Sequence, residues 1–162
     1  MPDFRILGPL EVVDETGTLL LGGLKQRAVL ALLLLEAPKA VSTDRLIDSL
    51  WAEQPPRTAS TSLQNFISQL RKMLGADVLV TKPPGYALAI TPDQVDLTRF
   101  RHLIATARAT TEPVQRATMM REALDLWRGA PLADFEFEPF AQSEIAQLKE
   151  ERLRGEPQSP CA

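Results

Sequence analysis

The stretch at residues 57–90 most constrains how this chain can fold, because a helical pattern is followed directly by a hairpin pattern. When its residues are placed at intervals of about 100° around a helix, the large apolar side chains fall within roughly one third of the circumference. These side chains are Leu63, Phe66, Ile67, Leu70 and Leu74. Two β-rich arms, at residues 78–80 and 86–90, then flank a tip at residues 82–85. The pattern predicts an amphipathic helix over residues 58–74 and a two-stranded hairpin after it.

The opposite face of this helix is polar and contains no acidic side chain. Its members are Thr61, Gln64, Asn65, Ser68 and Lys72. Asn and Gln can pair bidentately with adenine edges, Ser and Thr can reach any base, and Lys or Arg can hold guanine or phosphate. A solvated helix surface would have the same composition, but a basic hairpin follows directly. The combination therefore favours a DNA recognition helix with a wing.

The hairpin tip carries one charge on a stiff turn. Gly85 is expected to adopt a backbone angle that other residues avoid, and Pro83 and Pro84 restrict the turn beside Lys82. A rigid tip of this kind can hold a cation beside a phosphate or a minor groove at little ordering cost.

Charge is distributed unevenly along the chain. The net charge is −3, so the molecule as a whole is not a polycation. Residues 54–90 nevertheless carry Arg57, Arg71, Lys72 and Lys82 against Asp77 alone, a local balance of +3. Any affinity for nucleic acid must come from this middle patch.

The residues before this patch predict the frame of a winged helix-turn-helix. Short β-compatible pieces separated by turn signals predict a small antiparallel sheet; they lie at residues 4–7, 10–13 and 18–21. Residues 25–37 predict a helix that is apolar almost all round, and residues 46–51 a short helix capped by Ser42 or Thr43. Pro55 and Pro56 separate that helix from the next. From the N-terminus, the predicted order is therefore strands, helix, helix, loop, helix and hairpin.

The remainder of the chain predicts helices only. Residues 91–93 read as a linker, and apolar stripes at residues 97–107 and 114–127 predict two helices joined like a tetratricopeptide hairpin. A third helix is expected at about residues 140–153. The predicted fold is mainly α with small antiparallel sheets: a winged helix-turn-helix at 1–92, a helical domain at 93–154 and a disordered tail at 155–162.

The sequence lacks the motifs that are typical of several classes of enzyme and metal-binding protein. The chain has no phosphate loop or nucleophile elbow, and its one histidine, His102, has no partner at metal-ligand spacing. Asp134, Glu136 and Glu138 are read as a solvated loop around two buried aromatic residues. No enzymatic activity, metal or cofactor is therefore expected. The single cysteine and the shortness of every apolar run predict a cytoplasmic, nucleoid-associated protein without membrane contact.

Six segments together resemble the Streptomyces antibiotic regulatory protein family. They are FRILGPLEV at residue 4, KQRAVLALLLL at 25, SLW at 49, PPRTASTSLQNFISQLRKMLG at 55, TKPPGYAL at 81 and ALDLWRGAPLADF at 123. The resemblance implies an OmpR-type winged helix followed by a bacterial transcriptional activation domain, here about half the usual length. It also implies activators of secondary-metabolite (antibiotic) gene clusters that bind direct repeats in promoters and recruit RNA polymerase.

The resemblance carries DNA-binding roles over to residues that this chain fills with suitable side chains. These are Arg57, Thr61, Gln64, Asn65, Ser68, Arg71, Lys72 and Lys82. The expected partners are double-stranded DNA, RNA polymerase through the loop at residues 52–56, and a second copy on the repeat. Two alternatives stay open: a protein-interaction module, and a shortened regulator that occupies operators without activating.

Overall fold

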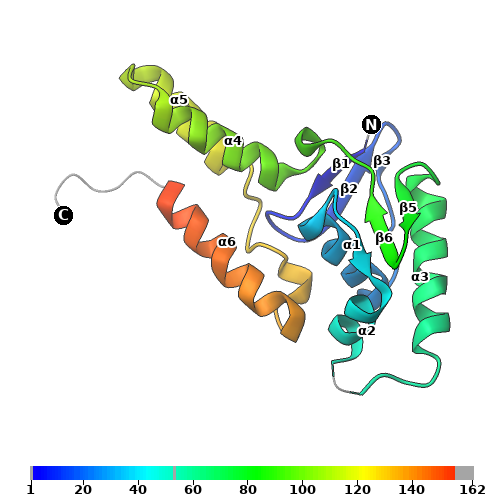
Figure 1. Cartoon of the computed structure of the whole chain (residues 1–162). Coiled ribbons are helices and arrows are strands. Elements are labelled where there is room, and N and C mark those ends of the chain that lie inside the picture. Colours follow the sequence, from blue (N-terminus) through cyan, green and yellow to red (C-terminus); the bar gives the residue numbers. More distant parts are fainter. Residues whose placement is uncertain (1, 53, 156–162) are drawn as a thin grey trace.

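Helix α1 (Leu24–Glu36) lies at the centre of the N-terminal half of the computed structural model, which describes residues 2–52 and 54–155 (Figure 1). Every side chain at residues 28–34 is buried. A helix that is apolar on all sides must be covered on all sides. Helices α2 (Thr43–Trp51) and α3 (Ala59–Leu74) pack against it, as the sequence predicted. Ser42 caps α2 by accepting a hydrogen bond from the amide of Arg45 at 3.1 Å.

Two small antiparallel sheets flank this helical core. The first has strands β1 (Asp3–Arg5), β2 (Glu11–Asp14) and β3 (Gly17–Thr18) in that order. The second contains the hairpin strands β5 (Leu79–Lys82) and β6 (Gly85–Leu88), in the register Val80 opposite Ala87. A strand that the sequence analysis did not predict, β4 (Val41–Ser42), pairs with the other side of β6. The wing is therefore part of a three-stranded sheet rather than a free hairpin.

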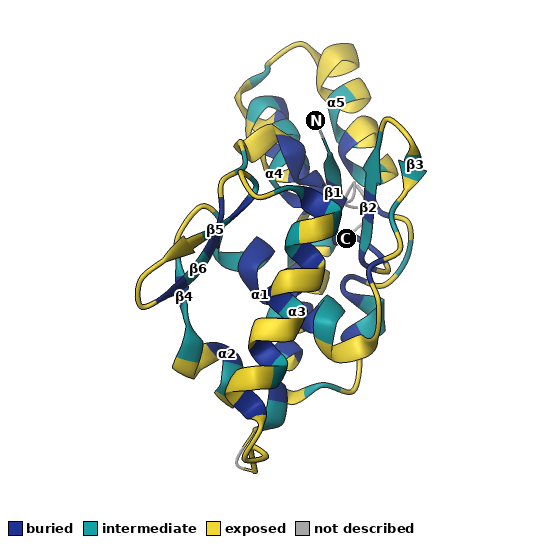
Figure 2. Cartoon of the chain, turned by 90° about the vertical axis from the view of Figure 1, so that its right-hand side faces the viewer, coloured by how far each residue is buried: buried dark blue, intermediate teal, exposed yellow. Residues whose placement is uncertain are grey.

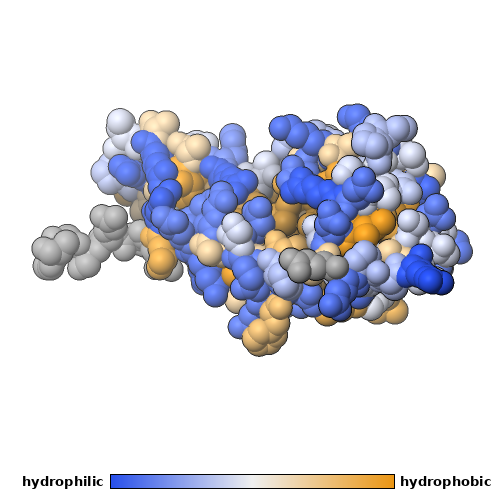
Figure 3. All heavy atoms as spheres, turned by 60° about the horizontal axis from the view of Figure 1, so that its bottom comes forward, coloured by the Kyte–Doolittle hydropathy of each residue, from blue (hydrophilic) through white to orange (hydrophobic). Residues whose placement is uncertain are grey.

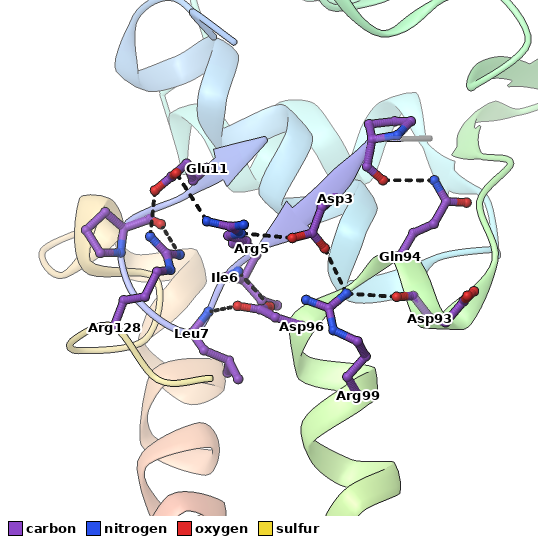
Figure 4. Close-up of polar contacts among 12 residues, drawn as sticks. Asp3, Arg5, Ile6, Leu7, Glu11, Asp93, Gln94, Asp96, Arg99 and Arg128 are labelled. Carbon is purple, nitrogen blue, oxygen red and sulfur yellow. Dashed lines mark hydrogen bonds and ion pairs between the residues drawn. The ribbon is translucent and has the colours of Figure 1, made fainter. Parts of the chain in front are cut away.

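Strand β1 ends earlier than the predicted strand at residues 4–7. The reason is that the backbone beyond Arg5 bonds to the C-terminal half instead of to β2. The amides of Ile6 and Leu7 donate to the two carboxylate oxygens of Asp96 at 2.9 and 3.0 Å (Figure 4). The carbonyls of the same two residues accept from the amides of Leu132 and Arg128. The segment directly after β1 thus joins the two halves of the chain.

Asp96 is the first residue of α4 (Asp96–Ala109) and is almost completely buried. Burial raises the pKa of its carboxyl group, while the hydrogen bonds from Ile6 and Leu7 oppose that rise. Ion pairs surround the junction: Arg99 donates to Asp3 at 2.8 Å, and Arg128 pairs with Glu11 at 2.9 Å (Figure 4). The two halves therefore meet through directed polar contacts as well as apolar packing.

The expected linker at residues 91–93 is instead an ordered turn. Residues Pro92–Gln94 form a 3-10 helix with a capping box made by Thr91 and Gln94. The Gln94 side chain donates to the carbonyl of Pro2 at 3.0 Å, and Phe4 bridges to Val95 in parallel. Because these polar groups are satisfied within the fold, the turn fixes the path of the chain into α4.

The C-terminal half contains the predicted helical hairpin. Helices α4 and α5 (Pro113–Asp125) pack side by side, and α6 (Gln142–Gly155) lies against them (Figure 1). The tail after Gly155 falls outside the described residues. The apolar stripe of α5 is only partly covered: Ala123 is buried, but Ala117 is exposed and Val114 is 71% exposed. The predicted apolar face of α5 is therefore left open at its N-terminal end.

The acidic loop before α6 also differs from the prediction. Phe135 is fully buried, but Phe137 is 90% exposed. Asp134 is not solvated: its carboxylate forms an ion pair with Arg27 of α1 and accepts from the amide of Leu10 at 2.8 Å. The loop thus contributes one aromatic anchor and one buried carboxylate to the junction.

The surface of the molecule is mainly polar on the face that looks down in Figure 1. The face seen in Figure 3 is mainly hydrophilic, with apolar patches between the charged side chains. Within residues 2–52 and 54–155, no helix has both the length and the apolar character needed to cross a membrane.

We expect Asp96→Ala to lower the free energy of unfolding by roughly 2–4 kcal/mol. Each of the two buried amides would lose its acceptor, at about 1–3 kcal/mol each, and relief of the buried carboxylate would offset part of that cost. Urea denaturation measures the change. Asp48→Ala, which removes an exposed carboxylate from α2, is the matched control and should be neutral. Equal stability of the two variants would contradict the stabilising role of Asp96 at the junction between the two halves.

Candidate nucleic-acid interface

Helix α3 presents one continuous polar face to solvent. Its inner side buries Ala59, Leu63, Ile67, Leu70 and Leu74 against the core. Figure 2 shows buried residues on that side of α3 and exposed residues along the outer side. The exposed set includes Thr61, Gln64, Asn65, Ser68 and Lys72. At 1.5 Å per residue the helix is about 24 Å long, enough to follow a major groove over several base pairs.

The middle of α3 is braced by α2. Phe66 lies parallel to Trp51 at the end of α2, with 6.5 Å between ring centroids. Lys25 of α1 places its ammonium group 5.3 Å from the Trp51 ring and donates to the carbonyl of Leu50 at 2.8 Å. Trp51 is thus a packing residue. These contacts fix the angle at which α3 leaves the core.

Arg71 connects α3 to the wing. Its Nε donates to the carbonyl of Leu79 at 3.0 Å, and its Nη2 donates to the hydroxyl of Thr81 at 3.1 Å. The side chain is half-buried, whereas the other seven predicted DNA-binding residues are exposed. The helical position of Arg71 could have indicated that its side chain is half-buried, because it lies about 80° around the helix from Leu63, at the border of the apolar face. The geometry gives Arg71 a positioning role that sequence reasoning missed.

The wing is held next to its tip by a close approach between strands. An ideal Cβ on Gly85 would lie 1.8 Å from the carbonyl oxygen of Val41 in β4. The amide and the hydroxyl of Thr43 both donate to the carbonyl of Pro84, at 3.2 and 3.1 Å. Gly85 does not have a positive φ, so the expected reason for this glycine, an unusual backbone angle, was wrong. The glycine is needed because β4 and β6 approach each other too closely for a side chain.

The charged members of the interface lie at its two ends. Arg57 is exposed just before α3, Lys72 is exposed in its last turn, and Lys82 is exposed at the end of β5. The sequence also allows a salt bridge between Arg57 and Glu53, but Glu53 lies outside the described residues. A polar centre between separated cations suits a duplex, in which bases lie between two phosphate strands.

Comparison with known proteins identifies both halves. Residues 18–88 match the family model "Transcriptional regulatory protein, C terminal", and residues 95–157 match "Bacterial transcriptional activator domain". The chain belongs to the Streptomyces antibiotic regulatory protein family. The two matches place an OmpR-type transcriptional regulatory domain before a bacterial transcriptional activator domain.

Relatives of this family member match almost its whole length. Regulatory protein AfsR of Streptomyces coelicolor is 37% identical over 93% of this chain and 16% of its own length. Regulatory protein DnrI of Streptomyces peucetius is 37% identical over 92% of this chain and 60% of its own. The structure of Mycobacterium tuberculosis EmbR in complex with a low-affinity phosphopeptide superposes with a TM-score of 0.88. That alignment has 35% identity and covers 95% of this chain and 43% of EmbR. This chain therefore spans less than two thirds of each relative.

We expect Gly85→Ala to destabilise the fold by at least about 2 kcal/mol, because the added methyl group meets backbone that cannot move aside. Gly129→Ala is the matched control, since a Cβ there has no atom within 4 Å. Thermal unfolding followed by circular dichroism measures both variants. A Gly85→Ala protein as stable as Gly129→Ala would contradict the close approach of β4 and β6.

Proposed function

We propose that this regulator is a sequence-specific DNA-binding activator of transcription, with residues 1–92 binding DNA and residues 93–154 acting as a partial activation domain. The observation that carries the proposal is the exposed, acid-free outer face of α3 beside the Lys82 wing. In this arrangement α3 enters a major groove while the wing contacts the adjoining backbone.

The proposed contacts divide into two groups. Thr61, Gln64, Asn65 and Ser68 lie at the centre of the face, where uncharged hydrogen-bonding groups can read base edges. Arg57, Lys72 and Lys82 lie at its ends and neutralise phosphates. Arg71 contacts phosphate while holding the wing against α3. A patch of net charge +3 neutralises few phosphates, so each half-site should bind modestly.

Modest half-site affinity favours two copies on one promoter. We infer that the sites are direct repeats, spaced by the DNA helical turn, in promoters of a secondary-metabolite gene cluster. RNA polymerase would be recruited through the loop at residues 52–56 and the helical half. The site of action would then be the nucleoid in the cytoplasm, with no catalytic step.

We expect Gln64→Ala and Asn65→Ala to relax sequence preference, because base-edge contacts distinguish sequences by about 1–3 kcal/mol each. Lys72→Ala should weaken binding to all duplexes. It should also reduce by about 1 the slope of the logarithm of the binding constant against the logarithm of the salt concentration. Fluorescence anisotropy on promoter and scrambled duplexes, at several salt concentrations, measures both effects. Equal losses on both duplexes from the first pair would remove Gln64 and Asn65 from the base-reading set.

The salt series also tests the rival reading as a protein-interaction module. Phosphate contact requires the affinity for DNA to fall as salt rises. A salt-independent affinity would contradict the DNA-binding proposal. A reporter assay separates activation from simple occupancy: promoter occupancy without increased transcription would contradict the activator role.

A further inference from the structure

The helical half carries an open groove at the end farthest from the acidic loop. Its floor is apolar and comes from Ala117, Met120 and Leu124 of α5, with the end of α6 closing one side at Gly155. Ala117 is exposed, and Met120 and Leu124 are half-buried. Apolar side chains that stay this open along a helix offer a surface for docking.

The rim of the groove is strongly basic. Arg108, Arg116, Arg121 and Arg154 line it, against the single acid Asp125. Arg154 pairs with Glu150 at 2.6 Å, but the other three arginines form no ion pair with any residue in the described part of the chain. An apolar floor with a cationic rim fits an apolar side chain flanked by acids.

The chain itself presents such a segment at Glu136, Phe137 and Glu138. The Phe137 ring is 90% exposed, and an exposed acid and a half-buried acid stand on either side of it. Large aromatic anchors that fill a pocket on the partner supply much of the binding energy at many interfaces.

The acidic segment is held rigidly in place. Gln142 donates from its side chain to the carbonyls of Glu136 at 2.6 Å and Glu138 at 3.0 Å. Beneath it, buried Phe135 packs against Phe140 with 5.6 Å between ring centroids. Phe137 is therefore presented on a loop that needs little further ordering when it binds.

The segment and the groove lie at opposite ends of α6, which crosses the helical half of the chain (Figure 1). The loop comes immediately before Gln142, and the groove includes Arg154 and Gly155. The 14 residues of the helix separate them by about 21 Å. The segment cannot reach the groove of its own chain, so any contact between them joins two molecules.

We propose that the Phe137 segment of one copy docks in the α5–α6 groove of a second copy. Phe137 would pack on Ala117, Met120 and Leu124, while Glu136 and Glu138 face Arg116 and Arg121. The contact is heterologous, so copies are arranged head to tail and each keeps one surface free. The area is small and the association is therefore weak. It does not depend on DNA binding, although two copies related in this way match a direct repeat better than a palindrome.

Sedimentation velocity of the DNA-free chain over a concentration series tests the contact. Phe137→Ala removes the anchor, and the double variant Arg116→Glu with Arg121→Glu reverses the rim. All three side chains are exposed, and circular dichroism checks that each variant is folded. We expect the wild type to form concentration-dependent dimers and larger species, and each variant to associate at least about tenfold more weakly. Leu20→Ala, at an equally exposed apolar residue on the β3–α1 connection, should behave like the wild type.

Mixing the two variants gives the sharpest result. The Phe137→Ala copy keeps an intact groove, and the charge-reversed copy keeps an intact segment, so one complete contact remains possible. A heterologous contact predicts recovery of association in the mixture that stops at dimers. The proposal is overturned if the wild type stays monomeric at every soluble concentration. It is also overturned if the variants associate like the wild type, or if the mixture fails to recover.

Discussion

The burial of Asp96 against the amides of Ile6 and Leu7 is the contact on which the arrangement of the two halves depends. A buried carboxylate is unfavourable unless hydrogen bonds satisfy it, and here two backbone donors do so. The same residues of the N-terminal segment accept hydrogen bonds from Arg128 and Leu132. The segment after β1 thus pairs with the helical half, and the two halves cannot separate without breaking these four hydrogen bonds.

This junction is coupled to the recognition face through the central helix. Arg27 of α1 pairs with Asp134 from the helical half, while Lys25 of α1 contacts Trp51, which in turn lies against Phe66 of α3. From the other end of α3, Arg71 reaches the wing. The outer face of α3 and the tip at Lys82 are therefore held by contacts that begin in the core, so that little ordering is needed on binding DNA.

Local patterns were enough to predict the helices and the wing. The apolar stripe from Leu63 to Leu74 located α3, and the prolines at 83 and 84 located the turn. The contacts between the halves could not be predicted in this way. Asp96 reads as an ordinary helix-initiating acid. The two amides that donate to its carboxylate lie about ninety residues away in the sequence. Gly85 likewise read as a turn glycine, because strand β4 is too short to give a sequence signal. Phe137 looked like a core residue, since alternation with acids does not show which side of a loop faces solvent.

Titration of the 15N-labelled chain with a promoter duplex, followed by NMR spectra of the backbone amides, tests the central claim most directly. The account predicts that the perturbed amides cluster on the outer face of α3, at Arg57 and at the Lys82 tip, while α4, α5 and α6 change little. Perturbations concentrated on the helical half, with α3 and the wing unchanged, would contradict it.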